Sequence, residues 1–172
     1  MTPLLRPLVT MTLILIPSLI SQGKDIFQRR EIQQLQTAHQ CFGCHLSKLN
    51  FSGANLQRVD LRSTDLRETN LKNANLRYAN LEWADLRNAN LQGADLTGAN
   101  LSSTLLVDSN LQGANLKGSK LELADLMNAN LSHASLIEAL RTEDIESNHS
   151  VTLCQTVLPK GTISTRNCQG HN

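Results

Sequence analysis

The residues of this chain with the clearest chemical potential lie in one short segment, where Cys41 and Cys44 enclose two residues and His45 follows directly. In an exported protein a C-x-x-C-H segment is typical of covalent haem attachment, in which both thiols bond to the porphyrin and the histidine ligates the iron. The same residues also fit a structural thiol pair or disulfide, a metal site that adds His39, or thiol redox chemistry. The motif by itself leaves these four kinds of site open.

Outside this segment the sequence shows no combination of residues that is typical of catalysis. It has no Ser-His-Asp set, no phosphate-binding loop and no paired-carboxylate pocket. Asp65 and Asp85 occupy equivalent positions of a repeat and are interpreted as part of it. We therefore predict a non-enzymatic protein with no catalytic residues, no metal site and no cofactor. The alternative function is a small redox or c-type haem protein that uses Cys41, Cys44 and His45.

A five-residue repeat occupies most of the chain and must position these residues. From Leu46 to Leu136 a large apolar residue, the centre of each unit, recurs every five positions in 19 consecutive units. This period fits neither a helix nor a strand and predicts a solenoid, in which each unit packs on its neighbours. The residue two before each centre is nearly always small. The residue just before it is Asn or Asp in 15 of 19 units, the exceptions being His45, Leu105, Lys120 and Ser135.

This A-(D/N)-L-x-x pattern, as in "ANLRYANLEWADLRNANLQGADLTGAN", resembles the pentapeptide-repeat family over about 95 of 172 residues. The resemblance implies an all-β fold, a right-handed quadrilateral parallel β-helix with one repeat on each of four faces. It also implies that the central Leu and the small residue point inward and that the last two positions of each unit point outward. It implies no particular function, because one scaffold serves many functions.

Columns of residues 20 apart give an independent check on this coil. One small-residue column contains only alanine, namely Ala54, Ala74, Ala94, Ala114 and Ala134. One polar column contains only asparagine, namely Asn50, Asn70, Asn90, Asn110 and Asn130. Asparagine amides can both donate and accept, so we expect these side chains to bond to one another along the stack.

The repeat register changes the interpretation of the cysteine motif. Extended backward, it places Cys41 at a centre, Cys44 at the small inward position and His45 where Asn or Asp normally stands. This favours a structural pair over a haem site. Members of the family often begin their repeats with C-x-x-C-D-L, which supports the same interpretation, although His45 departs from that pattern. From this resemblance, and from a similar cysteine-containing tail in exported members, we predict the disulfides Cys41–Cys44 and Cys154–Cys168.

The chain divides into four predicted parts. Residues 1–23 are expected to be a signal peptide, because Arg6 precedes a short apolar run and small residues precede a cut after Gly23; an uncleaved anchor is the competing interpretation. Residues 24–40 are predicted to form a helical N-terminal cap, with Asp25 as the N-cap residue. Residues 41–140 form the β-helix. Residues 141–172 form a C-terminal cap, with two short strands around Pro159-Lys160-Gly161.

The compartment and partners follow from these features and from charge. A signal peptide predicts export to the periplasm, the thylakoid lumen or the extracellular space, with no stable membrane anchor after cleavage. A net charge of +1 and basic residues spread over all four faces argue against nucleic-acid binding. Trp83 and Tyr78 are predicted to project outward beside Arg67 and Arg87, and form the candidate partner surface. The partner is an unknown protein, and a homodimer stays open.

Overall fold

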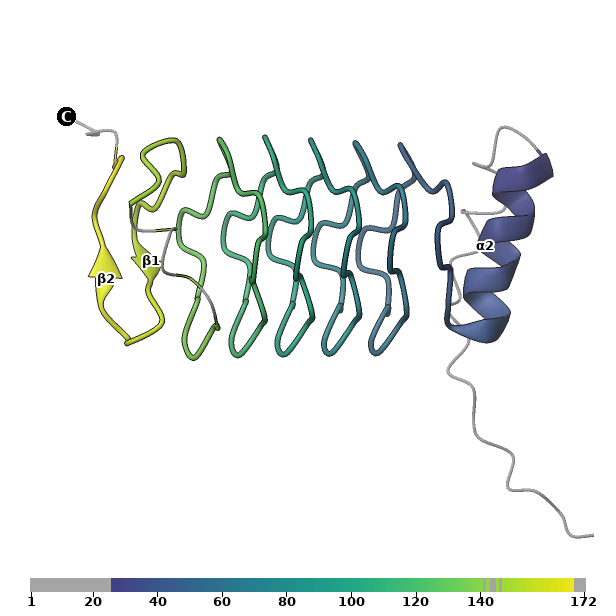
Figure 1. Cartoon of the computed structure of the whole chain (residues 1–172), viewed down its shortest axis with the longest axis horizontal. Helices are drawn as coiled ribbons and strands as arrows, with labels where there is room; N and C mark the ends of the chain where they lie inside the picture. Colours follow the sequence, from purple (N-terminus) through teal and green to yellow (C-terminus); the bar gives the residue numbers. More distant parts are fainter. Residues whose placement is uncertain (1–25, 141, 143–144, 146, 169–172) are drawn as a thin grey trace, which may run out of the picture.

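The computed structural model of the chain describes residues 26–140, 142, 145 and 147–168. Helix α2 (Ile26–Ala38), a stack of coils, and the antiparallel strands β1 (Thr156–Val157) and β2 (Ile163–Ser164) follow one another in this order. The stack runs along the long axis of the molecule, with α2 at one end and the β1–β2 pair at the other (Figure 1). The predicted signal peptide, residues 1–23, and the predicted N-cap Asp25 lie outside the described residues.

The coils repeat every 20 residues. Isolated parallel bridges join each residue just before a centre to its equivalent one coil later, from Gln40↔Asp60 to Lys120↔Leu140. Four such bridges fall in each coil, one for each five-residue unit, so the coil has four sides. Between coils the backbone N–H of nearly every centre donates to a carbonyl of the next coil, as Leu61 does to Asn80 at 2.8 Å. The predicted coil length and the parallel solenoid are confirmed.

The interior of the stack is filled by the two inward positions of each unit. Every centre from Leu46 to Leu136 is at most 5% exposed, and the small residues two positions earlier are buried except for the partly buried Ala124. Where this small residue is threonine, its hydroxyl donates to a backbone carbonyl oxygen. Thr64 donates to the carbonyl of Cys41, and Thr104 donates to that of Leu81. Alanine and leucine side chains thus pack against one another along the axis of the described coils.

Each corner of a coil is a tight turn that is closed by a backbone hydrogen bond. The carbonyl of a centre accepts the N–H three residues on, as Leu61 does from Thr64 at 3.3 Å. The third residue of the turn has a positive φ in nearly every unit, for example +57° at Tyr78 and +63° at Trp83. This is the geometry of a type II turn, which favours glycine or asparagine at that position. The pattern explains why glycines concentrate at these corners.

Leu123 gives a direct test of the corner geometry. It has a φ of +57°, which is in the strained left-handed region. Its side chain is 82% exposed, so packing of the side chain does little to offset this strain. We expect Leu123→Gly to raise the free energy of unfolding by about 1 kcal/mol. The measurement is the midpoint of urea unfolding. The matched control is Glu122→Gly at the preceding turn position, which lacks a positive φ and should not gain stability; equal gains in both variants would contradict the explanation.

The Asn or Asp before each centre has a structural task that the sequence did not reveal. In all 15 units that carry one, its Oδ1 accepts the backbone N–H two residues later, at 3.0–3.3 Å. Carbonyl groups of the backbone accept the other N–H groups of the unit. The Asn or Asp side chain supplies the acceptor for the N–H group that has no backbone partner. Bonds between amides do occur along the stack, from Asn75 to Asn55 and from Asn100 to Asn80. These pairs lie outside the pure asparagine column, for which the sequence predicts them.

The stack continues beyond the point where the sequence register ends. Asn130 bridges to Thr152 and Ser135 to Val157, so the last coil has two residues more than the others. The extra residues fall in the segment between Leu140 and Val151. Leu153 and Leu158 then take the inward places of the next two centres, at 1% and 9% exposure. A strict five-residue count misses this coil, because an insertion in a surface loop costs little while inward leucines remain favourable.

Strands β1 and β2 close the far end of the stack. They pair with Val157 opposite Ile163, and Gly161 in the turn between them has a φ of +84°. The prediction of two short strands around Pro159-Lys160-Gly161 is confirmed. Strand β1 also belongs to the last coil through Ser135↔Val157, so β2 is the outermost element at this end (Figure 1).

Helix α2 buries one face against the other end of the stack. Ile32 and Leu35 are 0% and 1% exposed, and the helix ends where His39 adopts a φ of +53° while its N–H still bonds to Leu35. Among the described residues, no helix has the length and apolar character needed to cross a membrane.

Candidate functional site

Cys41 and Cys44 form a disulfide at the entrance of the stack. Both are buried, at 0% and 4% exposure, and they occupy the centre and the small position of a repeat unit, as the register predicted. Haem attachment and thiolate ligation both need free thiols, and here each sulfur is bonded to the other. The disulfide therefore does not favour haem attachment, and the burial of both sulfurs does not favour redox exchange, which needs an accessible sulfur. Within the described ranges no group of three or more His, Cys, Asp and Glu residues is arranged to hold a metal ion.

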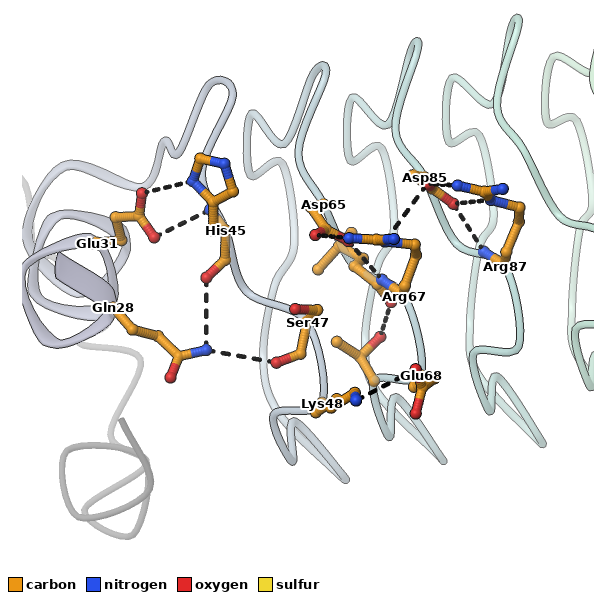
Figure 2. A network of polar contacts seen from close by, with 12 residues as sticks. Gln28, Glu31, His45, Ser47, Lys48, Asp65, Arg67, Glu68, Asp85 and Arg87 are labelled. Atoms are coloured by element: carbon orange, nitrogen blue, oxygen red, sulfur yellow. Dashed lines mark hydrogen bonds and ion pairs between the residues drawn. The ribbon is translucent and has the colours of Figure 1, made fainter. Parts of the chain in front are cut away.

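His45 takes part in the contact between the first coil and helix α2 (Figure 2). Its backbone N–H donates to Glu31 Oε2 at 2.9 Å, and its Nδ1 lies 3.3 Å from Glu31 Oε1. Gln28 Nε2 reaches the carbonyl oxygens of His45 and Ser47 at 3.5 and 3.4 Å. In later coils the equivalent N–H and carbonyl groups bond to the preceding coil, as Asp65 N–H does to Cys44. Side chains of α2 thus supply partners that the first coil would otherwise lack.

Cys154 and Cys168 form the second disulfide, at the opposite end of the molecule. Cys168 is exposed and Cys154 half-buried, in contrast to the first pair. A surface depression of about 650 Å³ lies beside this bond, lined in part by His133, Gln112 and Asn167. Arg166 supports the same region by donating to the carbonyl oxygens of Ile145, Asn148 and Val151, at 2.9–3.2 Å. Both predicted disulfide pairings are present in the structure.

Arg67 and Arg87, two residues of the candidate partner surface, are engaged by aspartates of their own coils (Figure 2). Arg67 bonds to Asp65 at 2.7 and 2.8 Å and lies 3.7 Å from Asp85, while Arg87 bonds to Asp85 at 2.6 and 2.9 Å. The hydrogen bond from the Arg67 side chain is the main cause that holds the pKa of Asp65 below its usual value, and partial burial of Asp65 opposes it. The two arginines are therefore less available to a partner than their exposed positions in the repeat suggest.

This pairing predicts a pH dependence of stability. Because the pKa of Asp65 is lower in the folded than in the unfolded chain, its contribution is present above about pH 4 and is lost as the pH falls through the folded pKa. We expect the wild-type chain to lose stability on acidification below about pH 4, and Asp65→Asn to lose less. Urea unfolding midpoints at neutral and acid pH measure this.

Asp125→Asn is the matched control for that experiment. Asp125 makes the same backbone bond, but Met127 stands at the position that Arg67 occupies relative to Asp65. If the Asp65→Asn and Asp125→Asn variants lost stability equally on acidification, the arginine pairing would not be the cause.

Trp83 and Tyr78 are both exposed, at 63% and 49%, on neighbouring sides of the stack. Tyr78 has the guanidinium carbons of Arg58 and Arg77 at 5.9 and 5.6 Å from its ring centroid. Its ring also covers Gly98, where an added Cβ would lie 2.6 Å from the ring atoms. Trp83 instead shares its side of the stack with Arg67 and Arg87, just before Asp85. The structure thus brings three of the four proposed surface residues to one side and places Tyr78 on the adjacent one.

The sequence reasoning missed a set of exposed apolar residues on the same side as Trp83. Leu105, Leu123 and Met127 are 39%, 82% and 48% exposed. One signal was visible, because Leu105 interrupts the column of Asn and Asp residues. Its meaning depends on which outward residues the coil brings together, and the alignment of coils supplies that information.

Comparison with known proteins points to one family. The model of the family described as pentapeptide repeats matches residues 40–73, 64–102 and 104–140. A pentapeptide repeat protein of the Arabidopsis thaliana thylakoid lumen is 31% identical, with a TM-score of 0.60 over 75% of this chain and 83% of that one. A pentapeptide repeat protein of the cyanobacterium Cyanothece 51142 is 30% identical, with a TM-score of 0.49 over 78% and 97%. No curated protein matches the chain.

Proposed function

Because the chain belongs to the pentapeptide-repeat family, whose members fold as right-handed quadrilateral β-helices, we propose that it is a non-enzymatic protein-interaction module exported from the cytoplasm. The observation that carries this proposal is the filled interior. Every inward position of the stack packs against its neighbours, so recognition falls to the outward side chains. No cofactor or metal has a part in this function, and neither nucleic acid nor a membrane is an expected partner.

The outward surface supports a protein partner over a small molecule. Trp83 is the single tryptophan of the chain and is 63% exposed, with Tyr78 exposed on the next side. Exposed aromatic residues beside arginines are typical of the residues that dominate binding energy at protein interfaces. Arg67 and Arg87 complete this proposed surface, although each must release or share its aspartate to bind a partner.

Export is supported by the disulfides and by one structural neighbour. Disulfides persist in oxidising compartments and are rare in the cytosol, and the chain has two. The similar protein from Arabidopsis thaliana belongs to the thylakoid lumen. We therefore propose that residues 1–23 are a cleaved signal peptide and that the mature protein acts in the periplasm, the thylakoid lumen or the extracellular space.

The ends of the stack have a supporting role in this proposal. We propose residues 24–40 as an N-terminal cap; the bonds from Gln28 and Glu31 of α2 to backbone groups of the first coil support this. We likewise propose residues 41–140 as the body and residues 141–172 as a C-terminal cap, which the β1–β2 pair and the Cys154–Cys168 disulfide support. Caps of this kind prevent open coil ends from pairing with other chains.

The experiment that tests the function is affinity capture from the exported fraction of the native cell, followed by sequencing of the mature N-terminus. We expect the wild-type protein to retain a specific protein and Trp83→Ala to retain less of it. Lys72→Ala, on another side of the stack, is the control for a general surface effect. A wild-type protein that retains nothing would contradict the interaction role. A mature chain that begins at Met1 would contradict cleavage of the signal peptide.

A further inference from the structure

On one side of the stack the outward side chains change from charged in the first half to largely apolar in the second. The middle column of this side is His45, Asp65, Asp85, Leu105 and Asp125, joined by parallel bridges. In the second and third coils the aspartate is followed two residues later by an arginine, which it binds. In the fourth coil these two positions are Leu105 and Val107, and in the fifth Met127 replaces the arginine. The charged pairs thus give way to apolar side chains.

The apolar residues on this side in the fourth and fifth coils are Leu105, Val107, Leu123 and Met127, which we call the apolar patch; Asp125 lies among them. Leu105 lies beside Asp125 through a backbone bridge, and the bond from Asp108 N–H to the Met127 carbonyl holds the chain after Val107 against Met127. Neighbouring coils are about 4.8 Å apart, so Val107 and Met127, which are 20 residues apart, lie side by side. Val107 is half-buried and the other three are exposed.

The fold does not account for apolar residues at two of these positions. Leu105 stands where 15 other units carry an Asn or Asp, and leucine has no oxygen to accept the N–H two residues later. Leu123 has a φ of +57°, which favours glycine or asparagine. Both residues therefore lower stability relative to the ordinary repeat residue. Local rules of a fold are broken mostly at sites that serve function.

Acidic side chains surround the apolar patch. Glu122 and Asp125 lie on either side of Leu123 in the chain, and Asp108 follows Val107. All three are exposed, and none takes part in any ion pair found in the described part of the chain. The nearest base of the same side, Arg87, is bound to Asp85. The apolar patch is thus bordered by three carboxylates that make no ion pair within the described residues, and the base nearest to them in the sequence is Lys120, two residues before Glu122.

We propose that the apolar patch with its acidic border is the docking surface for a cationic amphipathic segment of a partner protein. This inference rests on the proposed function and names the chemistry of the partner. Leucine-like side chains of the segment cover Leu105, Leu123 and Met127, and its lysines or arginines face Glu122, Asp125 and Asp108. Burial of the apolar surface supplies affinity, and the charges supply orientation and rate of association. A second copy in a two-fold contact would place acid against acid, and an anionic membrane would be repelled.

The test uses a synthetic amphipathic peptide of leucine and lysine, and an analogue with glutamine in place of lysine. Trp83 lies on the same side in the coil before Leu105 and is the single tryptophan, so we expect its fluorescence to report binding. We expect the lysine peptide to bind the full mature chain and its affinity to fall as the salt concentration rises. The glutamine analogue should bind at least about tenfold more weakly than the lysine peptide. Equal binding of both peptides, or none of the lysine peptide, overturns the proposal.

Two substitutions remove two of the four residues of the apolar patch and are expected to leave the fold intact. Leu105→Asn restores the usual repeat residue, and Leu123→Gly relieves a positive φ. The double variant should melt no lower than wild type and bind the lysine peptide about tenfold more weakly. The matched control is Leu140→Asn, which changes an exposed leucine at the same repeat position but on another side, next to Lys120. This control should bind as wild type does.

The remaining outcomes separate this inference from the function on which it rests. If the double variant captures the same native protein as wild type, the docking surface is wrong while the interaction role stands. If wild type captures no protein, the interaction role itself fails. A wild-type dimer in light scattering that Leu105→Asn dissociates would show that a second copy covers the apolar patch, and would overturn the proposal. Binding to vesicles of anionic lipid that the double variant loses would do the same.

Discussion

Replacing Ala94 with phenylalanine is expected to lower the free energy of unfolding by about 3 kcal/mol or more. Ala94 is 0% exposed in the middle of the stack, with Ala74 and Ala114 at the same place in the neighbouring coils. Adjacent coils are about 4.8 Å apart, so a phenyl ring must push them apart. The bonds from Asn115 to the Ala94 carbonyl and from Asp95 to the Ala74 carbonyl cross this position at 2.9 and 3.0 Å. The ring therefore costs backbone bonds as well as packing.

Urea unfolding followed by far-ultraviolet circular dichroism measures this loss. Lys72→Phe is the matched control, since Lys72 is exposed at an outward position of the same region. It adds the same ring without entering the core, and its effect should stay within about 0.5 kcal/mol. If the two variants unfold at the same urea concentration, Ala94 does not point inward.

Loss of the Cys154–Cys168 bond is expected to cost about 3 kcal/mol, because it closes a loop whose ends are 14 residues apart in sequence. The loop contains β2, which has β1 as its only strand partner among the described residues. Without the bond, β2 and Arg166 can separate from the last coil. Arg166 then no longer donates to the carbonyls of the loop before β1.

The experiment replaces both cysteines with alanine and compares urea unfolding with and without a reducing agent. The Cys154→Ala, Cys168→Ala variant should resemble reduced wild type, because exposed Cys168 is accessible to the reductant while Cys41 and Cys44 are buried. Hydrogen exchange should increase first in residues 156–164. If oxidised wild type and the double variant unfolded at the same urea concentration, the disulfide would not stabilise the folded chain.

The core of this fold was predictable from the sequence, and the chemistry of its surface was predictable only in part. The five-residue period determines which side chains point inward, because inward positions share one environment and tolerate only large apolar or small residues. The same register placed Cys41 and Cys44 inside the first coil, and they are bonded and buried there. It also placed Trp83 and Tyr78 outside, where both are exposed.

The outward residues were harder to interpret, because each has several partners within reach. The asparagine column was expected to bond along the stack, yet its oxygens accept the N–H two residues later in the same coil. Arg67 and Arg87 were expected to face a partner, and both bind an aspartate two residues earlier. The choice among such partners depends on distances of a few tenths of an ångström, which a spacing pattern does not contain.

The amino-acid sequence alone thus determined the repeat, its coil length and the inward positions, since these follow from the size of each side chain and a constant period. The tertiary structure alone decided the extended last coil, the bonds made by helix α2 and the grouping of Leu105, Val107, Leu123 and Met127. These features join residues 14 to 22 positions apart. Their contacts depend on how coils align in space, and a loop can gain two residues at almost no cost in free energy.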